Sequence, residues 1–243
     1  MKKLIEGASR LGITLDAAQI NQFEIYYREL ISWNKKINLT AITDYQEVQL
    51  KHFLDSLTVT LALTAEELTR PGLSLIDIGS GAGFPGIPLK LLLRHSRLVL
   101  VESRLKKATF LHHIVERLGL SQVEVVAGRA EEIAHLPQFR EQFALSVSRA
   151  VTSLPAAVEL ALPFCQIGGK FVAQKKGEIE PEVSQAGKAT DALGGRLSQV
   201  KKIELDGDMR YLVIIDKIAP TPEKYPRRPG IPERRPIRGE KGS

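Results

Sequence analysis

The feature that most constrains the fold is the stretch 73–86, where an apolar segment ends in an acid and runs into a glycine-rich loop. Asp77 closes the apolar segment, and Gly79, Gly81 and Gly83 follow it at alternate positions. Glycine allows the backbone to turn tightly and to approach a ligand closely. The pattern therefore predicts a first parallel β-strand that carries a nucleotide-type cofactor loop at its carboxyl end.

Strand-like and helix-like segments alternate after this loop, which is typical of a parallel sheet covered by helices on both faces. The expected strands are 73–78, 97–101, 122–127, 143–147 and 170–173, and the expected helices between them are 86–95, 105–118, 130–135 and 154–162. A helix over 178–193 precedes two further strands, 197–205 and 210–218, and the short connection between those strands allows only an antiparallel hairpin. We therefore predict an α/β fold with a Rossmann-like, seven-stranded sheet of the S-adenosylmethionine methyltransferase type.

Composition divides the chain into three parts. Residues 1–65 are expected to form a helical extension, because apolar residues recur at three- and four-residue steps after the candidate N-cap Asp16, and a second helix is expected over 46–63. Residues 66–219 form the predicted α/β domain. The tail 220–243 holds six of the 13 prolines, so we expect it to be extended rather than helical.

The same tail carries seven Lys and Arg against three Glu, which is +4 of the chain's net charge of +6. An excess of positive charge in a mobile segment suits a nucleic-acid backbone. A tail that merely aids solubility would have the same composition, so charge alone leaves both interpretations open.

Overall composition indicates a globular protein of the cytoplasm. Hydrophobic residues make up 43% and charged residues 26% of the chain. We expect no membrane span, because no run approaches the ~18 apolar residues that one requires, and no signal peptide, because the first residues lack its apolar core. Cys165 is the only cysteine, so a reduced setting is the default and no metal site is expected.

The glycine spacing distinguishes two kinds of nucleotide cofactor. The dinucleotide pattern G-x-G-x-x-G fits only from Gly81, three residues past the strand, and it leaves Asp77 without a role. The register acid-x-Gly-x-Gly-x-Gly puts Gly79 directly after the strand and uses every element, which favours S-adenosylmethionine. Main-chain N–H groups would then face the methionine carboxylate, while Asp77 would hold the loop or receive the cofactor's amine through water.

Two later strand ends offer contacts to a nucleoside. Glu102 ends the second strand and can accept hydrogen bonds from both ribose hydroxyls, which holds for NAD as well as for S-adenosylmethionine. After the third strand, residues 128–131 lead into a helix where main-chain groups would grip an adenine, although Glu131 also simply suits a helix N-terminus. An NAD-dependent oxidoreductase, a small-molecule methyltransferase and a non-catalytic RNA-binding module remain alternatives at this point.

The substrate of an open parallel sheet lies beyond the carboxyl ends of the strands, which here are followed by residues 148–151 and 174–177. The chain has neither the Asn/Asp-Pro-Pro-aromatic sequence used on exocyclic base amines nor a Pro-Cys nucleophile for pyrimidine carbon 5. A ring nitrogen such as guanine N7 fits these absences, because it has an in-plane lone pair and no proton to remove. Positioning alone can then supply ~7–11 kcal/mol.

Together these motifs resemble the bacterial glucose-inhibited division protein B family, the 16S ribosomal RNA guanine-N7 methyltransferases known as small-subunit methyltransferase G. The segments that carry the resemblance are 33–40, 52–56, 77–88, 148–150 and 224–232. The Gly-Phe-Pro-Gly-Ile-Pro continuation of the loop and the Tyr-Pro-Arg-Arg-Pro-Gly segment of the tail are far more specific than the glycine loop itself.

The resemblance implies S-adenosylmethionine-dependent methylation of guanine N7 in the decoding region of 16S rRNA, with the 30S subunit as partner. We expect a monomer, although the sequence does not reveal whether the protein dimerises. With the loop register included, the expected cofactor residues are Asp77, Gly79, Gly81, Gly83, Phe84, Glu102, Ala130, Glu131 and Arg149. The resemblance also implies a substrate cleft lined by the N-terminal helices, whose candidate catalytic residues are Asn38, His52, Asp55, Arg149 and Lys175. Asn38 is expected to cap a turn or to bind a base edge.

Overall fold

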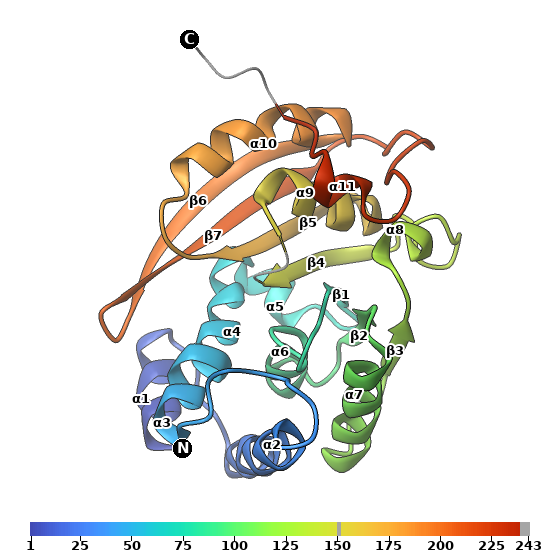
Figure 1. Ribbon diagram of the computed structural model, residues 1–243. Coiled ribbons are helices and arrows are strands. Elements are labelled where there is room, and N and C mark those ends of the chain that lie inside the picture. The colour runs from blue at the N-terminus through green and yellow to red at the C-terminus, as the bar shows by residue number, and fades with distance from the viewer. Residues whose placement is uncertain (150–151, 239–243) are drawn as a thin grey trace.

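A computed structural model describes residues 1–149 and 152–238, and it contains one seven-stranded sheet in the order β3-β2-β1-β4-β5-β7-β6 (Figure 1). The strands are β1 (Ser74–Ile78), β2 (Arg97–Glu102), β3 (Val123–Ala127), β4 (Phe143–Arg149), β5 (Cys165–Lys175), β6 (Gly195–Leu205) and β7 (Asp208–Lys217). The first five strands are parallel, and β7 pairs antiparallel with both β5 and β6. The predicted parallel sheet with a terminal hairpin is therefore confirmed.

Helices cover both faces of the sheet (Figure 1). They are α1 (Lys2–Arg10), α2 (Ala17–Asn34), α3 (Tyr45–Val48), α4 (Asp55–Leu57), α5 (Ala65–Thr69), α6 (Gly86–Leu92), α7 (Leu105–Arg117), α8 (Ala130–Ile133), α9 (Leu154–Ala161), α10 (Glu180–Ala192) and α11 (Ile231–Arg234). Within the described residues, no helix has both the length and the apolar character that crossing a bilayer requires.

Alternate side chains of each buried strand enter two separate cores. Leu75 of β1 belongs to the core that includes Phe110 of α7, whereas Ile76 belongs to the core that includes Val158 of α9. This division follows from the two-residue period of a strand. Because both faces are covered, the central strands are apolar on both sides, as their sequence shows.

Most boundaries lie within a few residues of prediction, and two regions differ more. β5 begins at Cys165, before the predicted 170, because a register shift after Phe143 carries the pairing past two glycines that interrupt the apolar pattern. The helix predicted over 46–63 is instead a run of short segments in which a π-helical turn (Gln49–Leu54) separates α3 from α4, and a 3-10 turn (Thr58–Ala62) follows. Apolar periodicity cannot reveal a π turn, which is common at functional sites.

The N-terminal helices are fixed to the glycine loop. Asp16 caps α2 as predicted, in a reciprocal capping box with Gln19. Tyr26, which is fully buried in α2, donates a hydrogen bond from its hydroxyl to the main-chain oxygen of Ala82 at 2.5 Å, and its ring stacks on Phe84. The packing of α2 is thereby coupled to the conformation of the loop.

The C-terminal tail lies against the body of the protein. Arg227 forms a two-pronged ion pair with the fully buried Glu159 of α9, at 2.8 Å from Nε and 2.6 Å from Nη2. The main-chain N–H of Gly230 donates to Glu131 at 2.8 Å, and the Arg140 guanidinium donates to the main-chain oxygen of Tyr225. The tail is therefore anchored, which corrects the expectation of a mobile arm.

The tail also contains a helix, contrary to prediction. α11 follows Gly230, whose φ of 77° ends the extended segment, and it lies beside α9 (Figure 1). Pro232 stands in the first turn, where a missing N–H breaks no helical hydrogen bond. Residues 239–243, which include the tail cation Lys241, lie outside the described part of the chain.

We predict that Arg227→Ala lowers the free energy of unfolding by about 3 kcal/mol, because it leaves Glu159 buried without its partner. Arg228→Ala is the matched control, since Arg228 is exposed, and it should change stability by less than about 0.5 kcal/mol. Urea unfolding followed by circular dichroism measures both. Equal stability of the two variants would show that the tail is not anchored by this pair.

Candidate active site

The glycine loop after β1 has a conformation that other residues rarely adopt. Gly79, Gly81 and Gly83 have φ values of 71°, 60° and 93°. A Cβ atom at Gly83 would come within 2.6 Å of the Tyr26 hydroxyl oxygen. The main-chain N–H of Gly79 donates to the Val101 oxygen at 2.9 Å, so the loop is also tied to the end of β2.

Asp77 holds the loop to the following helix. It is fully buried, and its Oδ2 accepts a hydrogen bond of 2.8 Å from the N–H of Gly86, the first residue of α6. A Cβ atom at Gly86 would lie 2.8 Å from that same oxygen, which is too close, so position 86 requires glycine. Burial raises the pKa of Asp77 to about 7, although the Gly86 N–H opposes the rise. Of the two roles expected from the sequence, the contacts support loop holding.

Glu102 has a similar position at the end of β2. Its Oε2 accepts from the N–H of Gly81 at 2.9 Å, and its Oε1 accepts from the N–H of Arg104 at 2.8 Å. A carboxylate offers about four acceptor sites. Two of these positions are used within the chain, so the carboxylate keeps acceptor capacity beyond its main-chain contacts.

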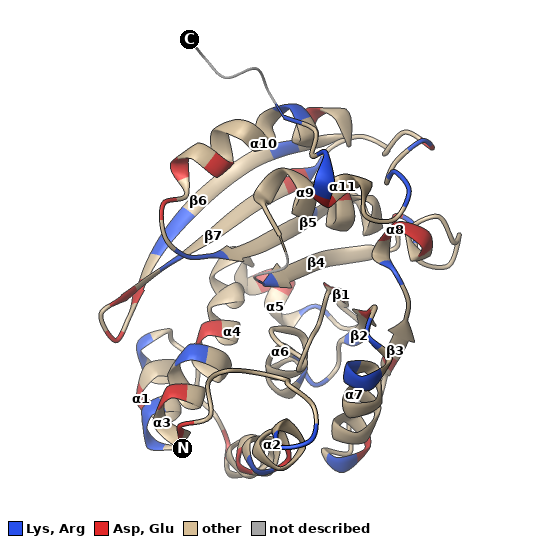
Figure 2. Cartoon of the chain, viewed as in Figure 1, with Lys and Arg blue, Asp and Glu red and all other residues tan. Residues whose placement is uncertain are grey.

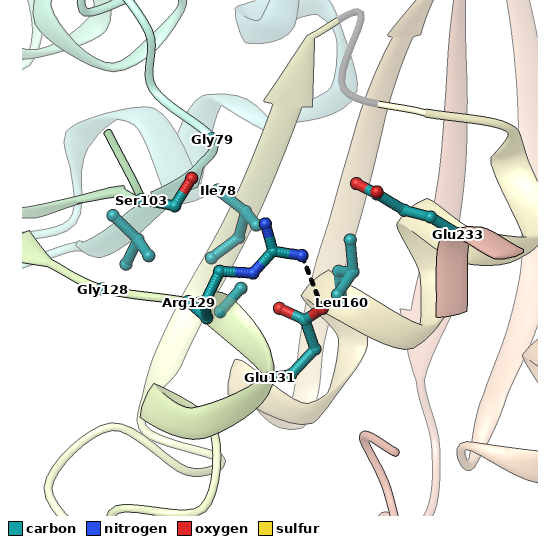
Figure 3. A pocket seen from close by; sticks show the side chains of 10 residues that line it. Ile78, Gly79, Ser103, Gly128, Arg129, Glu131, Leu160 and Glu233 are labelled. Carbon is teal, nitrogen blue, oxygen red and sulfur yellow. Dashed lines mark hydrogen bonds and ion pairs between the residues drawn. The ribbon is translucent and has the colours of Figure 1, made fainter. Parts of the chain in front are cut away.

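The ends of β1, β2 and β3 border an opening of about 350 Å³, part of which is open to solvent, and we call it the β1–β3 pocket (Figure 3). The residues that shape it include Ile78, Gly79, Ala130, Glu131, Leu160 and Glu233. Apolar side chains with a few polar groups are typical of small-molecule sites. Glu131 is buried and pairs with Arg129 at 3.0 Å. Three predicted cofactor residues therefore meet here, together with Glu233, which reaches the pocket from α11 (Figure 3).

A second and larger opening, the β4–β5 pocket, encloses about 1060 Å³ of empty space. Four of the five predicted catalytic residues line it, and they are His52, Asp55, Arg149 and Lys175. The pocket also includes Gln174, which belongs to the predicted substrate segment 174–177, and Arg210, which the sequence did not predict. Ala150 and Val151, which belong to the predicted substrate segment, lie outside the described residues.

Arg149 organises this pocket. Its Nη1 donates to Asp55 Oδ2 at 3.1 Å and to the main-chain oxygen of Lys51 at 3.0 Å, while its Nη2 lies 3.2 Å from His52 Nδ1. The guanidinium carbon is 4.9 Å from the centre of the Phe84 ring, on which the His52 ring also stacks at 4.6 Å. Phe84 belongs to the glycine loop, so its ring joins the loop to the β4–β5 pocket.

His52 contacts both donors and acceptors. Its Nδ1 lies 3.2 Å from the Arg149 guanidinium, which only donates, and 3.1 Å from the main-chain oxygen of Lys51, which only accepts. Its Nε2 lies 2.7 Å from Thr40 Oγ1, which can donate or accept, so both tautomers of the neutral ring have partners. Burial, with the charge of Arg149 as the second cause, lowers the pKa of His52 to about 3. The ring is therefore neutral at physiological pH and is a weak base.

Asn38 does not join the other candidates. It is exposed, whereas Asn34 caps this turn by accepting hydrogen bonds from the N–H groups of Leu39 and Thr40 at 2.8 and 2.9 Å. The capped turn presents the Thr40 hydroxyl to His52. The motif 33–40 thus contributes to the pocket through Asn34 and Thr40 rather than through Asn38.

The β4–β5 pocket has an excess of positive charge. Its lining includes five Lys and Arg residues and two acids, Asp55 and Glu182. Lys175 is paired with Glu182 at 2.8 Å, whereas Lys176 is exposed and has no ion pair in the described part of the chain. Arg210 reaches the pocket because β7 runs antiparallel, which places its first residues at the carboxyl edge of β4 and β5. Basic residues also line β6 (Figure 2), so positive charge is not confined to the tail.

A seven-stranded sheet with a terminal antiparallel hairpin, a glycine loop after β1 and an acid at the end of β2 defines the S-adenosylmethionine-dependent methyltransferase class. Solved structures share this fold at low identity. A methyltransferase of this class from Aquifex aeolicus is 17% identical with a TM-score of 0.53, over 77% of this chain and 98% of that chain. TrmN from Thermus thermophilus is 17% identical with a TM-score of 0.51, over 70% of this chain and 53% of that chain.

Sequence comparison identifies the family. The family model described as rRNA small subunit methyltransferase G matches residues 19–211. A ribosomal RNA small subunit methyltransferase G from Dehalococcoides mccartyi is 49% identical over 98% of this chain and 100% of the relative, and one from Pelotomaculum thermopropionicum is 48% identical over 96% of each. The chain belongs to the rRNA small subunit methyltransferase G family. Neither an NAD-dependent oxidoreductase nor a small-molecule methyltransferase is supported.

We predict that Gly79→Val abolishes binding of S-adenosylmethionine, because a β-branched residue at a φ of 71° is strained and Gly79 lines the β1–β3 pocket. Gly72→Val is the matched control, since Gly72 has a φ of 69° and a Cβ atom there meets nothing within 4 Å. Isothermal titration calorimetry on both folded variants measures the affinity. Unchanged affinity in Gly79→Val would contradict the assignment of this loop.

Asp77 should make stability depend on pH. Because burial raises its pKa in the folded protein from 3.8 to about 7, ionisation of Asp77 opposes folding, and the wild type loses stability as the pH rises through that window. We predict that Asp77→Asn gains stability relative to the wild type between about pH 4 and pH 7, by up to ~4 kcal/mol, with no further gain above it. Chemical unfolding at several pH values measures this difference, and a constant difference would refute it.

Proposed function

We propose that this chain transfers the methyl group of S-adenosylmethionine to N7 of a guanine in 16S rRNA, acting as a monomer on the small ribosomal subunit in the cytoplasm. The relatives' name supports a small-subunit rRNA substrate. The observation that carries the proposal is the Phe84 ring, which contacts His52 and Arg149 and so joins the glycine loop to a large cationic pocket.

The β1–β3 pocket fits the proposed cofactor. Gly79, Ala130 and Glu131 would hold it, and the free acceptor positions of Glu102 would receive its ribose hydroxyls. Asp77, Gly81 and Gly83 would act indirectly by fixing the loop, and Phe84 and Arg149 would close the end that faces the substrate. When bound, S-adenosylmethionine supplies an electrophilic methyl group on a sulfonium, which needs no further activation.

The β4–β5 pocket suits a ring nitrogen as the acceptor. N7 of guanine has a lone pair and no proton, so its methylation needs no general base. His52, with a pKa of about 3, is poorly suited to that role, and Arg149 is already engaged by Asp55 and Lys51. These groups would instead position the base, and positioning can supply ~7–11 kcal/mol.

The excess of positive charge suits a phosphate backbone. Lys176, which is exposed, and Arg210 would contact phosphates, whereas Lys175 is held by Glu182 and would act mainly by shaping the pocket. We propose that the extension 1–65 forms the substrate-side wall and that the tail 220–243 completes the cofactor side.

The proposed activity predicts stoichiometric methylation of one guanine. Small subunits from a strain that lacks the corresponding activity would be incubated with the enzyme and labelled S-adenosylmethionine, and the product mapped by N7-specific cleavage and reverse transcription. The Gly79→Val variant serves as the negative control, and purified 16S rRNA shows whether assembly is required. Absence of label from guanine N7 in both substrates would refute the proposal.

A further inference from the structure

Two buried oxygen atoms of the β4–β5 pocket have no hydrogen-bond partner within the described part of the chain, namely Asp55 Oδ1 and Gln174 Oε1. Both side chains belong to residues that are only 5% exposed. Buried acceptors are nearly always paired, because an unpaired one costs about 1–3 kcal/mol. Two of them in one pocket indicate a ligand that donates two hydrogen bonds.

The orientation of the Gln174 amide is determined by its contacts. Its Nε2 donates to the main-chain oxygen of Asp55 at 2.6 Å, and a carbonyl oxygen can only accept. Nε2 also lies 3.2 Å from Thr58 Oγ1, whose own proton is donated to the same carbonyl at 2.6 Å. The nitrogen end of the amide is therefore committed, and Oε1 is left as an acceptor.

Asp55 is oriented by two arginines. Its Oδ2 accepts from Arg149 at 3.1 Å, while its Oδ1 lies 3.5 Å from Arg210 Nε and makes no hydrogen bond there. The Gln174 side chain is itself bonded to the main chain of Asp55, so the two acceptors belong to directly contacting residues.

We propose that Asp55 Oδ1 and Gln174 Oε1 recognise the target guanine by accepting hydrogen bonds from its N1–H and its N2 amine. This inference rests on the proposed function. Guanine alone among the standard bases has two adjacent donors on one edge, which becomes accessible when a base leaves its stack. N7 lies on the opposite side of the purine, so recognition of this edge leaves the reacting atom free. The same pair of acceptors disfavours adenine, whose N1 has no proton.

The test uses inosine, which keeps N7, O6 and N1–H but lacks the N2 amine. Small subunits are reconstituted with guanine or inosine at the target position, and kcat/KM is measured for each. We expect the wild type to prefer guanine by about tenfold or more, because losing one donor leaves a buried acceptor unpaired. Binding of both subunits in the absence of cofactor should show the same preference.

Two variants identify the acceptors. In Asp55→Asn, the amide oxygen takes the Oδ2 position, because Arg149 donates a hydrogen bond there. The amide nitrogen then takes the Oδ1 position, which changes that position from an acceptor to a donor. Gln174→Met keeps the length of the side chain without its oxygen. One of the two variants removes the acceptor that binds the N2 amine. In that variant, the ratio of kcat/KM on the guanine subunit to kcat/KM on the inosine subunit should fall to about one. Thr58→Val is the matched control, since it perturbs the Gln174 amide without removing Oε1, and it should retain the preference.

Wild-type enzyme that methylates both subunits equally, or a tenfold preference that survives in both variants, would overturn the inference while leaving the proposed function intact. Absence of N7 methylation on the guanine subunit by the wild type would instead refute the proposed function. Calorimetry with S-adenosylmethionine should give unchanged affinity in both variants, because neither residue lines the β1–β3 pocket.

Discussion

Two buried carboxylates at neighbouring strand ends hold the glycine loop in one conformation, and the rest of the site depends on them. Asp77 ends β1 and binds the first N–H of α6, whereas Glu102 ends β2 and binds the N–H of Gly81. Each accepts from main chain, so the loop is restrained between two strands and a helix. Without this restraint, neither the β1–β3 pocket nor the position of Phe84 would be defined.

The Phe84 ring connects the glycine loop to the β4–β5 pocket through its contacts. The ring stacks on Tyr26 of α2 and on His52 of the π turn, and the Arg149 guanidinium lies over it. Elements distant in sequence thus meet at a single aromatic ring. A substrate base in the β4–β5 pocket would be placed relative to the loop through this ring, which is what an in-line methyl transfer requires.

The net charge of the C-terminal tail does not show which of its residues bind within the protein. Its composition leaves a basic arm for RNA and a solubilising tail equally open, whereas the structure shows that Arg227 pairs with the buried Glu159 and that Gly230 binds Glu131 beside the β1–β3 pocket. Lys224, Arg228, Arg234 and Arg235 of the tail remain exposed, and five further cations line the β4–β5 pocket.

The sequence by itself determined the strands, the glycine register and the family, because these depend on local periodicity and on residues adjacent in the chain. It also predicted His52, Asp55, Arg149 and Lys175 as one group, through motifs that the family resemblance supplies. Only the tertiary structure decided that Asn34 rather than Asn38 caps the turn, that Arg210 lines the β4–β5 pocket, and that Glu233 lines the β1–β3 pocket. These outcomes depend on an antiparallel strand, a π turn and a docked tail, which bring together residues that are distant in the sequence. Contacts between residues so far apart in the chain leave no periodic pattern in the sequence.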